Sequence, residues 1–167
     1  MGGRRRPVTT IRPFRVRWLG RVRYRDALAL QQRIHAEEPT APQDHLLLLE
    51  HHAVYTLGLR ATLDHLLAPA NEIDAEVVQA DRGGDITYHG PGQIVGYPII
   101  SLDRRRDLHA YLRFLEQVMI KSVGTLGLAA TRRDGMTGIW LGTSKVAAIG
   151  VAVRRWVAYH GFALNVN

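Results

Sequence analysis

One stretch of the chain concentrates glycines and polar side chains, RGGDITYHGPGQIVGYPI at residues 82–99. Gly83 and Gly84 allow positive φ and let a ligand lie against bare main chain, and residues 90–92 form a second, rigid turn. If residues 86–89 are extended, successive side chains point to opposite faces, which suits the wall of a site. A simple hairpin needs fewer polar residues, so we interpret the segment as a binding loop. It contains neither GxGxxG nor GK[ST], which excludes a dinucleotide fingerprint and a phosphate P-loop.

Lys145 and His160 are the other side chains that could do chemistry. Lys145 lies in SKVAAIG, residues 144–150, and apolar or glycine residues follow it, so its ammonium lies where the chain enters the core. A lysine at a strand edge commonly only prevents aggregation, whereas a partly desolvated ammonium can lower the pKa of a neighbouring acid or transfer protons. His160 lies in YHGFALNVN, residues 159–167, and both it and His89 could either orient a site or simply fill it.

Several classes of site are absent from the sequence. There is no cysteine, which excludes disulfides, thiolate metal sites and a cysteine nucleophile within these 167 residues. The histidines lack the spacing of metal ligands, and no GxSxG nucleophile elbow occurs. We therefore expect neither a metal nor another cofactor.

Length and charge limit the class of protein. The chain has 167 residues, of which 46% are apolar, and this suffices for one domain with its own core. Its net charge of +7 favours acidic partners, but no aromatic ladder accompanies the N-terminal arginines, which favours a solvated face over a nucleic-acid site. No apolar run reaches the ~20 residues of a membrane span, and there is no secretory signal. We expect a cytoplasmic protein without nucleic-acid or membrane partners.

The hydrophobic pattern predicts a single α/β domain whose sheet is mixed or antiparallel. Helices are predicted over residues 24–37 and from an N-cap at Asp107 to Gly124 or Gly127. Strands are predicted over residues 15–19, 46–50, 53–57, 77–78, 94–100, 138–141, 146–153 and 156–166. We place 46–50 and 53–57 in the same sheet, and Pro98 argues for an edge or a bulge in its strand. Residues 1–10 are expected to be a disordered basic tail, and residues 11–167 the domain.

These segments together resemble the lipoyl/octanoyl transferase family. The matching stretches are LGRVRYRDALALQQ, LLLLEHHAVYTLG, RGGDITYHGPGQIVGYPI, GIWL, KVAAIGVAV and HGFALNVN, which span nearly the whole chain in the family's order. The resemblance implies the fold of biotin protein ligases and lipoate ligases, an α/β (α+β) domain with a mixed, largely antiparallel sheet flanked by helices. It also implies an octanoyltransferase, which moves an octanoyl group from acyl carrier protein to a lysine of a lipoyl domain in lipoate biosynthesis.

The resemblance further implies an acyl-binding site and a catalytic lysine. Acyl-binding roles carry over to Arg82, Gly83, Gly84, Asp85, Ile86, Thr87, Tyr88, His89, Ala148, Ile149, Gly150, Gly161, Phe162 and Ala163. Lys145 is implied to lower the pKa of a catalytic thiol and to transfer protons. The implied reaction passes the acyl group from a thioester to an enzyme thiol, then to a lysine amine in the lipoyl domains of 2-oxoacid dehydrogenases or the glycine-cleavage H protein. No cofactor is implied.

The family's nucleophile is a cysteine in a PCG-type turn that follows the NVN segment, and this chain ends at Asn167 without it. We therefore expect the 167 residues to be an incomplete catalytic domain that does not form the acyl-enzyme, with truncation favoured over a damaged gene or an inactive homologue. Two other functions stay open. One is an ATP-dependent lipoate or biotin ligase, which needs no cysteine, and the other is a non-catalytic binder of acyl carrier protein.

Overall fold

The computed structural model describes residues 12–37, 43–65 and 74–167. In chain order the elements are β1 (Phe14–Val22), α1 (Tyr24–Glu37), β2 (Asp44–His51), β3 (Val54–Leu57), the short 3₁₀ helix η1 (Leu63–His65), β4 (Glu76–Gln79), β5 (Ile86–His89), β6 (Gln93–Ser101), α2 (Leu108–Gly124), β7 (Ile139–Leu141), β8 (Ser144–Arg154) and β9 (Val157–Asn165). Both predicted helices are confirmed, and Asp107 caps α2 by accepting a hydrogen bond from the N–H of Ala110 (2.9 Å). The tail expected at residues 1–10 lies outside the described residues.

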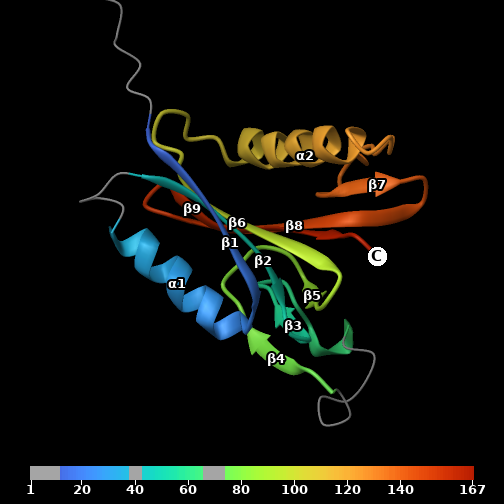
Figure 1. Ribbon diagram of the computed structural model, residues 1–167, viewed down its shortest axis with the longest axis horizontal. Coiled ribbons are helices and arrows are strands. Elements are labelled where there is room, and N and C mark those ends of the chain that lie inside the picture. The colour runs from blue at the N-terminus through green and yellow to red at the C-terminus, as the bar shows by residue number, and fades with distance from the viewer. Residues whose placement is uncertain (1–11, 38–42, 66–73) are drawn as a thin grey trace, which may run out of the picture.

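The strands form two sheets (Figure 1). The larger has six strands in the order β1-β2-β6-β9-β8-β7, parallel between β1 and β2 and antiparallel elsewhere. The smaller has three strands in the order β4-β3-β5, with β3 parallel to β4 and antiparallel to β5. The predicted mixed, largely antiparallel architecture is therefore confirmed.

The placement of residues 46–50 and 53–57 in one sheet is wrong. The first segment lies in β2 of the large sheet, and the second in β3, the middle strand of the small sheet. A bend at His52 and Ala53 separates the two strands. Because both are short apolar runs, their pattern predicts strands without predicting which sheet each one joins.

The helices α1 and α2 cover opposite faces of the large sheet (Figure 1). Val95 and Ile99 of β6 share an apolar cluster with Ile34 of α1. On the other face, Leu115 and Met119 of α2 belong to clusters that contain residues of β8. Strands β8 and β9 are thus part of a packed layer, which makes them a rigid base for a site. No helix in the described part of the chain is both long and apolar enough to cross a membrane.

Pro98 lies in the middle of the large sheet, because β6 is flanked by β2 and β9. It pairs with Leu46 of β2, but the β6–β9 ladder is interrupted on its other side. Proline has no N–H to give to a ladder, and His160, which lies opposite, adopts φ 56° and donates its N–H to Gln31 Oε1 (2.8 Å). The predicted edge position is wrong, because Pro98 lies in a central strand at a point where the ladder to β9 is interrupted.

Candidate functional site

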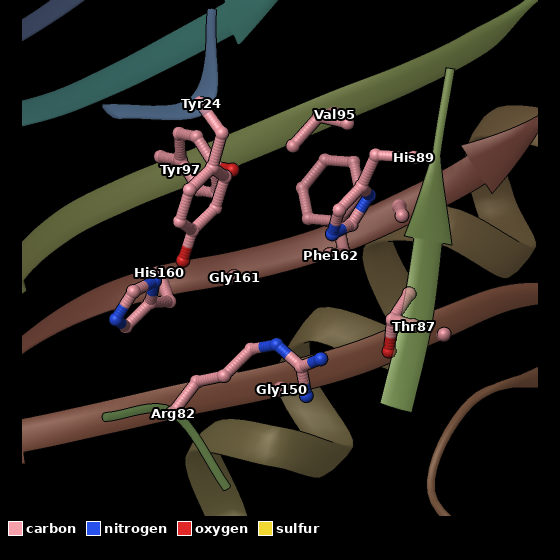
Figure 2. A pocket seen from close by; sticks show the side chains of 12 residues that line it. Tyr24, Arg82, Thr87, His89, Val95, Tyr97, Gly150, His160, Gly161 and Phe162 are labelled. Carbon is pink, nitrogen blue, oxygen red and sulfur yellow. The ribbon is translucent and has the colours of Figure 1, made fainter. Parts of the chain in front are cut away.

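A narrow slot lies between β5 and the pair β8 and β9 (Figure 2). Strand β5 contributes polar side chains, β8 and β9 contribute mostly small ones, and aromatic rings lie at the inner end, next to the start of α1. The slot is lined by Tyr24, Arg82, Thr87, His89, Val95, Tyr97, Ala148, Gly150, His160, Gly161, Phe162 and Ala163. Its cavity volume is about 20 Å³, so the lining side chains lie close together.

A wider hollow of about 350 Å³ adjoins the slot. The two spaces share the lining residues Arg82, Thr87, Ala148 and Ala163, which places them side by side. Lys145 lies in the outer hollow, and it also lines a neighbouring hollow of about 500 Å³. Lys145 lines the outer hollow but not the slot, whereas Ala148 and Gly150, further along β8, line the slot, so we place the mouth of the slot on the side of this lysine.

Close approaches of main chain make the site depend on glycine. Gly84 has φ +95°, a conformation that side chains rarely adopt. A Cβ on Gly150 would lie 2.8 Å from the carbonyl oxygen of Gly83, so the loop and β8 touch through bare backbone. The N–H of Gly83 also donates to the carbonyl oxygen of Val151 (2.9 Å). The glycine-rich loop is therefore fastened directly to β8.

Arg82 is a buried cation beside the slot, with 6% of the residue exposed. Its Nη2 donates to both the carbonyl oxygen and the hydroxyl of Thr56 (2.7 Å each), and its Nη1 donates to the carbonyl oxygen of Gly83 (3.1 Å). Burial lowers the pKa of Arg82, but a guanidinium stays protonated in proteins. A fixed positive charge next to an apolar floor suits a ligand that joins a hydrocarbon chain to a carbonyl group.

His89 is neutral and has a protein partner near each ring nitrogen. Burial is the main cause that lowers its pKa to about 4. Its Nδ1 lies 2.7 Å from Gln93 Oε1. Because an amide oxygen only accepts, Nδ1 carries the ring proton and donates it. Its Nε2 lies 3.3 Å from Thr56 Oγ1. Gln93 in turn donates from Nε2 to Asn165 Oδ1 (2.9 Å). This series of contacts ties β3, β5, β6 and β9 together, so His89 orients the wall of the slot.

The inner end of the slot is also polar, but some of its atoms lack a protein partner. His160 Nε2 lies 2.7 Å from Asp81 Oδ1, and the Asp81 carboxylate also accepts a hydrogen bond from the hydroxyl of Tyr159. Burial lowers the pKa of His160, while Asp81 opposes that shift. Within the described ranges, neither His160 Nδ1 nor the hydroxyl of Tyr24 has a hydrogen-bond partner, although both are buried.

Lys145 lies at the mouth of the slot and is exposed to solvent, although neighbouring side chains cover part of it. Its Nζ lies over the ring of Trp140, 5.2 Å from the centroid, and its Cε is 2.7 Å from the position of a Cβ on Gly138. Partial burial lowers the pKa of Lys145, which increases the fraction of neutral amine at a given pH. A lysine in this state can accept a proton from an incoming nucleophile.

Comparison with known proteins identifies the family to which the domain belongs. Residues 23–167 match the lipoyl protein ligase A/B catalytic domain. An octanoyltransferase from Geobacter metallireducens is 51% identical over 155 residues, covering 91% of this chain and 70% of the relative. One from Solibacter usitatus is 49% identical over 158 residues, covering 91% of this chain and 71% of the relative. The chain belongs to the lipoyl protein ligase A/B catalytic domain family.

Within this family the chain is of the octanoyltransferase type, which confirms the family and the acyltransferase class expected from the sequence. Solved structures share the fold. A lipoate-protein ligase A bound with ATP has a TM-score of 0.74 at 19% identity, covering 92% of this chain and 66% of that protein. A bipartite lipoate protein ligase from Thermoplasma acidophilum has a TM-score of 0.67 at 17% identity, covering 93% and 62%. The chain thus spans about seven tenths of the length of the two octanoyltransferases, and 66% and 62% of the two solved ligases.

The structure brings all the acyl-binding positions implied by the family resemblance to this connected space. Eight of them line the slot, and the others, Gly83, Gly84, Asp85, Ile86, Tyr88 and Ile149, line the outer hollows together with Lys145. Their roles in acyl binding and catalysis stay predictions. Sequence reasoning missed Tyr24, Thr56 and Tyr97, whose apolar or strand-like surroundings gave no functional signal. Among the described residues, no group of three or more histidine, aspartate or glutamate side chains could hold a metal ion.

Proposed function

We propose that this domain binds the octanoyl chain of octanoyl-acyl carrier protein in the outer hollow of about 350 Å³, with the methyl end directed toward the slot, and transfers the octanoyl group to a lysine of a lipoyl domain. The observation that carries the proposal is the position of Lys145 at the mouth of a slot whose floor contains Ala148, Phe162 and Ala163. A saturated chain needs an apolar slot, in which each buried CH₂ contributes about 0.8 kcal/mol. The octanoyltransferase relatives support this choice of acyl group.

The distribution of polarity suggests how the acyl group is oriented. Its methylene groups lie along the small residues of β8 and β9, and its thioester carbonyl lies outward, where Arg82 and Lys145 face the outer hollow. Negative charge grows on the carbonyl oxygen when a nucleophile adds to the thioester. The fixed charge of Arg82 stabilises that oxygen without any rearrangement.

Lys145 is the group that we assign to proton transfer. The acceptor lysine arrives protonated, because an exposed ammonium has a pKa of about 10.4. Only the neutral amine attacks a thioester, so a base has to take up a proton first. Lys145 is suited to this because partial burial lowers its pKa. When it is protonated, its ammonium would stabilise a thiolate next to it.

The 167 residues contain no cysteine, so they provide acyl binding and proton transfer without a thiol. A route through an enzyme thioester therefore needs a thiol from outside these residues. We expect this chain to bind the acyl donor without becoming octanoylated itself.

Charge supports acidic carrier proteins as partners. Arg60 and Lys145 line the larger outer hollow, and the guanidinium of Arg133 lies 5.5 Å from the ring centroid of Trp140, which lines the same hollow. A basic rim of this kind raises the association rate of an acidic protein. We assign octanoyl-acyl carrier protein as the donor and lipoyl domains of 2-oxoacid dehydrogenases and the glycine-cleavage H protein as acceptors, with the reaction in the cytoplasm.

Binding of octanoyl-acyl carrier protein tests the proposal. We expect the octanoyl group to increase the affinity at least tenfold over the same carrier without it, as measured by calorimetry. Gly84→Val should remove this gain, because the side chain strains a backbone with φ +95° beside the slot. Gly127→Val is the matched control, since Gly127 has a similar φ of +80° but open surroundings, and it should keep the gain.

Three results would contradict the proposal in different ways. Equal affinity for the two carriers would exclude acyl recognition by the slot. Release of pyrophosphate from ATP, magnesium and free lipoate would favour a lipoate ligase instead. A gain in the mass of the chain by one octanoyl group would show that these residues do contain a nucleophile.

A further inference from the structure

Two buried polar atoms at the inner end of the slot have no protein partner. They are Tyr24 Oη and His160 Nδ1, in residues that are 2% and 1% exposed, and no atom of the described residues bonds to either. Both residues line the slot, and Figure 2 shows the Tyr24 hydroxyl pointing toward His160. Buried polar groups in native proteins nearly always bond to protein or to ordered water. The pair therefore points to something bound between them.

The two atoms are complementary as donor and acceptor. Burial raises the pKa of Tyr24 to about 12, so its hydroxyl keeps its proton and can donate. The Asp81 carboxylate, 2.7 Å from His160 Nε2, holds the imidazole proton on that nitrogen. In the neutral ring Nδ1 then carries a lone pair and accepts. A single molecule of water can accept from Tyr24 and donate to His160.

Neighbouring polar groups are already engaged elsewhere. The Tyr97 hydroxyl lies 2.7 Å from His51 Nε2, and Arg82 donates to Thr56. The whole slot, which Tyr24 and His160 line together with ten other residues, encloses about 20 Å³, and one water needs ~10–15 Å³. The slot therefore has room for one water, and Tyr24 and His160 offer it two polar partners, which is the minimum that a buried water uses.

We propose that Tyr24 and His160 hold one water at the inner end of the slot and thereby limit the length of the acyl chain. This inference rests on the proposed function, because it requires an acyl chain in the outer hollow whose methyl end points toward the slot. A chain that stops short of the pair leaves the water in place. A longer chain expels the water and leaves both polar atoms buried against its methyl end, which lowers its affinity.

Free fatty acids of six to fourteen carbons test the inference on the chain as it is, without the transfer reaction. Affinity is measured by displacement of a fluorescent fatty acid. We expect affinity in the wild type to rise with length to octanoate and then to fall. Tyr24→Phe removes the donor to the water, so the affinity for dodecanoate relative to octanoate should increase about tenfold.

Tyr111→Phe provides the matched control. Tyr111 is 6% exposed, and its hydroxyl also has no partner among the described residues, but it belongs to α2, packs in the apolar cluster of that helix and does not line the slot. This variant should keep the wild-type length profile. If Tyr24→Phe binds octanoate with an unchanged length profile, the length limit is wrong and the proposed function stands. If the wild type binds none of the fatty acids, both are wrong.

Discussion

The two ends of the slot differ in how completely their polar atoms are paired. Around His89, the side chains of Thr56, Gln93 and Asn165 form a continuous series of contacts. At the inner end, Tyr24 Oη and His160 Nδ1 bond to no atom of the described residues. Burial of a polar atom without a hydrogen-bond partner is unfavourable at either end of the slot. The contrast separates polar residues that hold the walls together from polar residues that face a ligand.

The difference follows from the elements that carry these residues. The paired side chains lie on strands of both sheets, so their bonds fasten the small sheet to the large one. Tyr24 begins α1, and His160 lies opposite Pro98, where the ladder between β6 and β9 is interrupted. Neither of them joins the two sheets, so pairing at the inner end is not needed to position the wall.

Removal of one hydroxyl from each region should give the largest contrast. Thr56→Val deletes an oxygen that accepts from two nitrogens of Arg82 and leaves those donors buried beside it. We expect the free energy of unfolding to fall by about 3 kcal/mol. Tyr24→Phe deletes a hydroxyl whose proposed partner is one water, and we expect a loss of about 1 kcal/mol or less. Urea unfolding of both variants measures the difference, and equal losses would remove the distinction between the two regions.

Local features of the fold could be predicted from local sequence. The apolar spacing in residues 24–37 matches α1, and Asp107 caps α2 as its position before an apolar periodic segment indicates. The glycine-rich stretch lines the slot and the outer hollow, and its main chain approaches β8 so closely that a Cβ on Gly150 would lie 2.8 Å from the carbonyl oxygen of Gly83. These predictions depend on interactions over a few residues, which a single sequence contains.

The partners of each element could not be predicted in this way. The alternation of side chains in β3 is the same whichever sheet the strand joins. Pro98 is tolerated in a central strand because the N–H of His160, which Pro98 leaves without a partner in the ladder, donates to Gln31, a residue far away in the sequence. Thr56 and Tyr24 enter the site only through this long-range arrangement. Their sequence neighbours indicate a strand and a helix start, and nothing in them indicates a slot.

One of the two histidines that line the slot, His89, allows the comparison to be tested by changing the pH. His89 has a folded-state pKa of about 4 against ~6.5 when unfolded, so between these values the unfolded state binds a proton that the folded state does not. Stability is therefore full above about pH 6.5 and is lost as the pH falls toward about 4. We expect His89 to account for a loss of about 2 kcal/mol between pH 7 and pH 5. Urea unfolding at the two pH values provides the measurement.

The slope of the unfolding free energy against pH, compared between variants, separates the contribution of His89 from that of the other histidines. His89→Gln should be less stable at pH 7 but should lose less stability than the wild type on going to pH 5. His109→Gln, at an exposed position of α2, serves as the control and should keep the wild-type slope. If His89→Gln also kept that slope, then His89 would be protonated in the folded protein and would not be a fixed part of the wall.

The smallest expected effect concerns the mouth of the slot, where the chain offers an internal reference. The chain has two lysines, Lys145 and Lys121, and both are exposed to solvent, Lys121 on α2 and Lys145 at the mouth of the slot. Only a neutral amine reacts with an acylating reagent, and partial burial lowers the pKa of Lys145. Labelling of Lys145, followed by mass spectrometry of peptides across a pH series, should therefore reach half-maximum at a lower pH than that of Lys121.

Addition of octanoate turns this measurement into a test of orientation. If the hydrocarbon chain points inward, its carboxylate lies near Lys145 and favours the charged ammonium, so the Lys145 labelling curve should move to higher pH. The Lys121 curve should not move, because α2 presents that residue away from the slot lining. A fatty acid that binds without moving the Lys145 curve would place the carboxylate elsewhere. The polar inner end would then be the better candidate for the carbonyl, and the roles of the two regions would be exchanged.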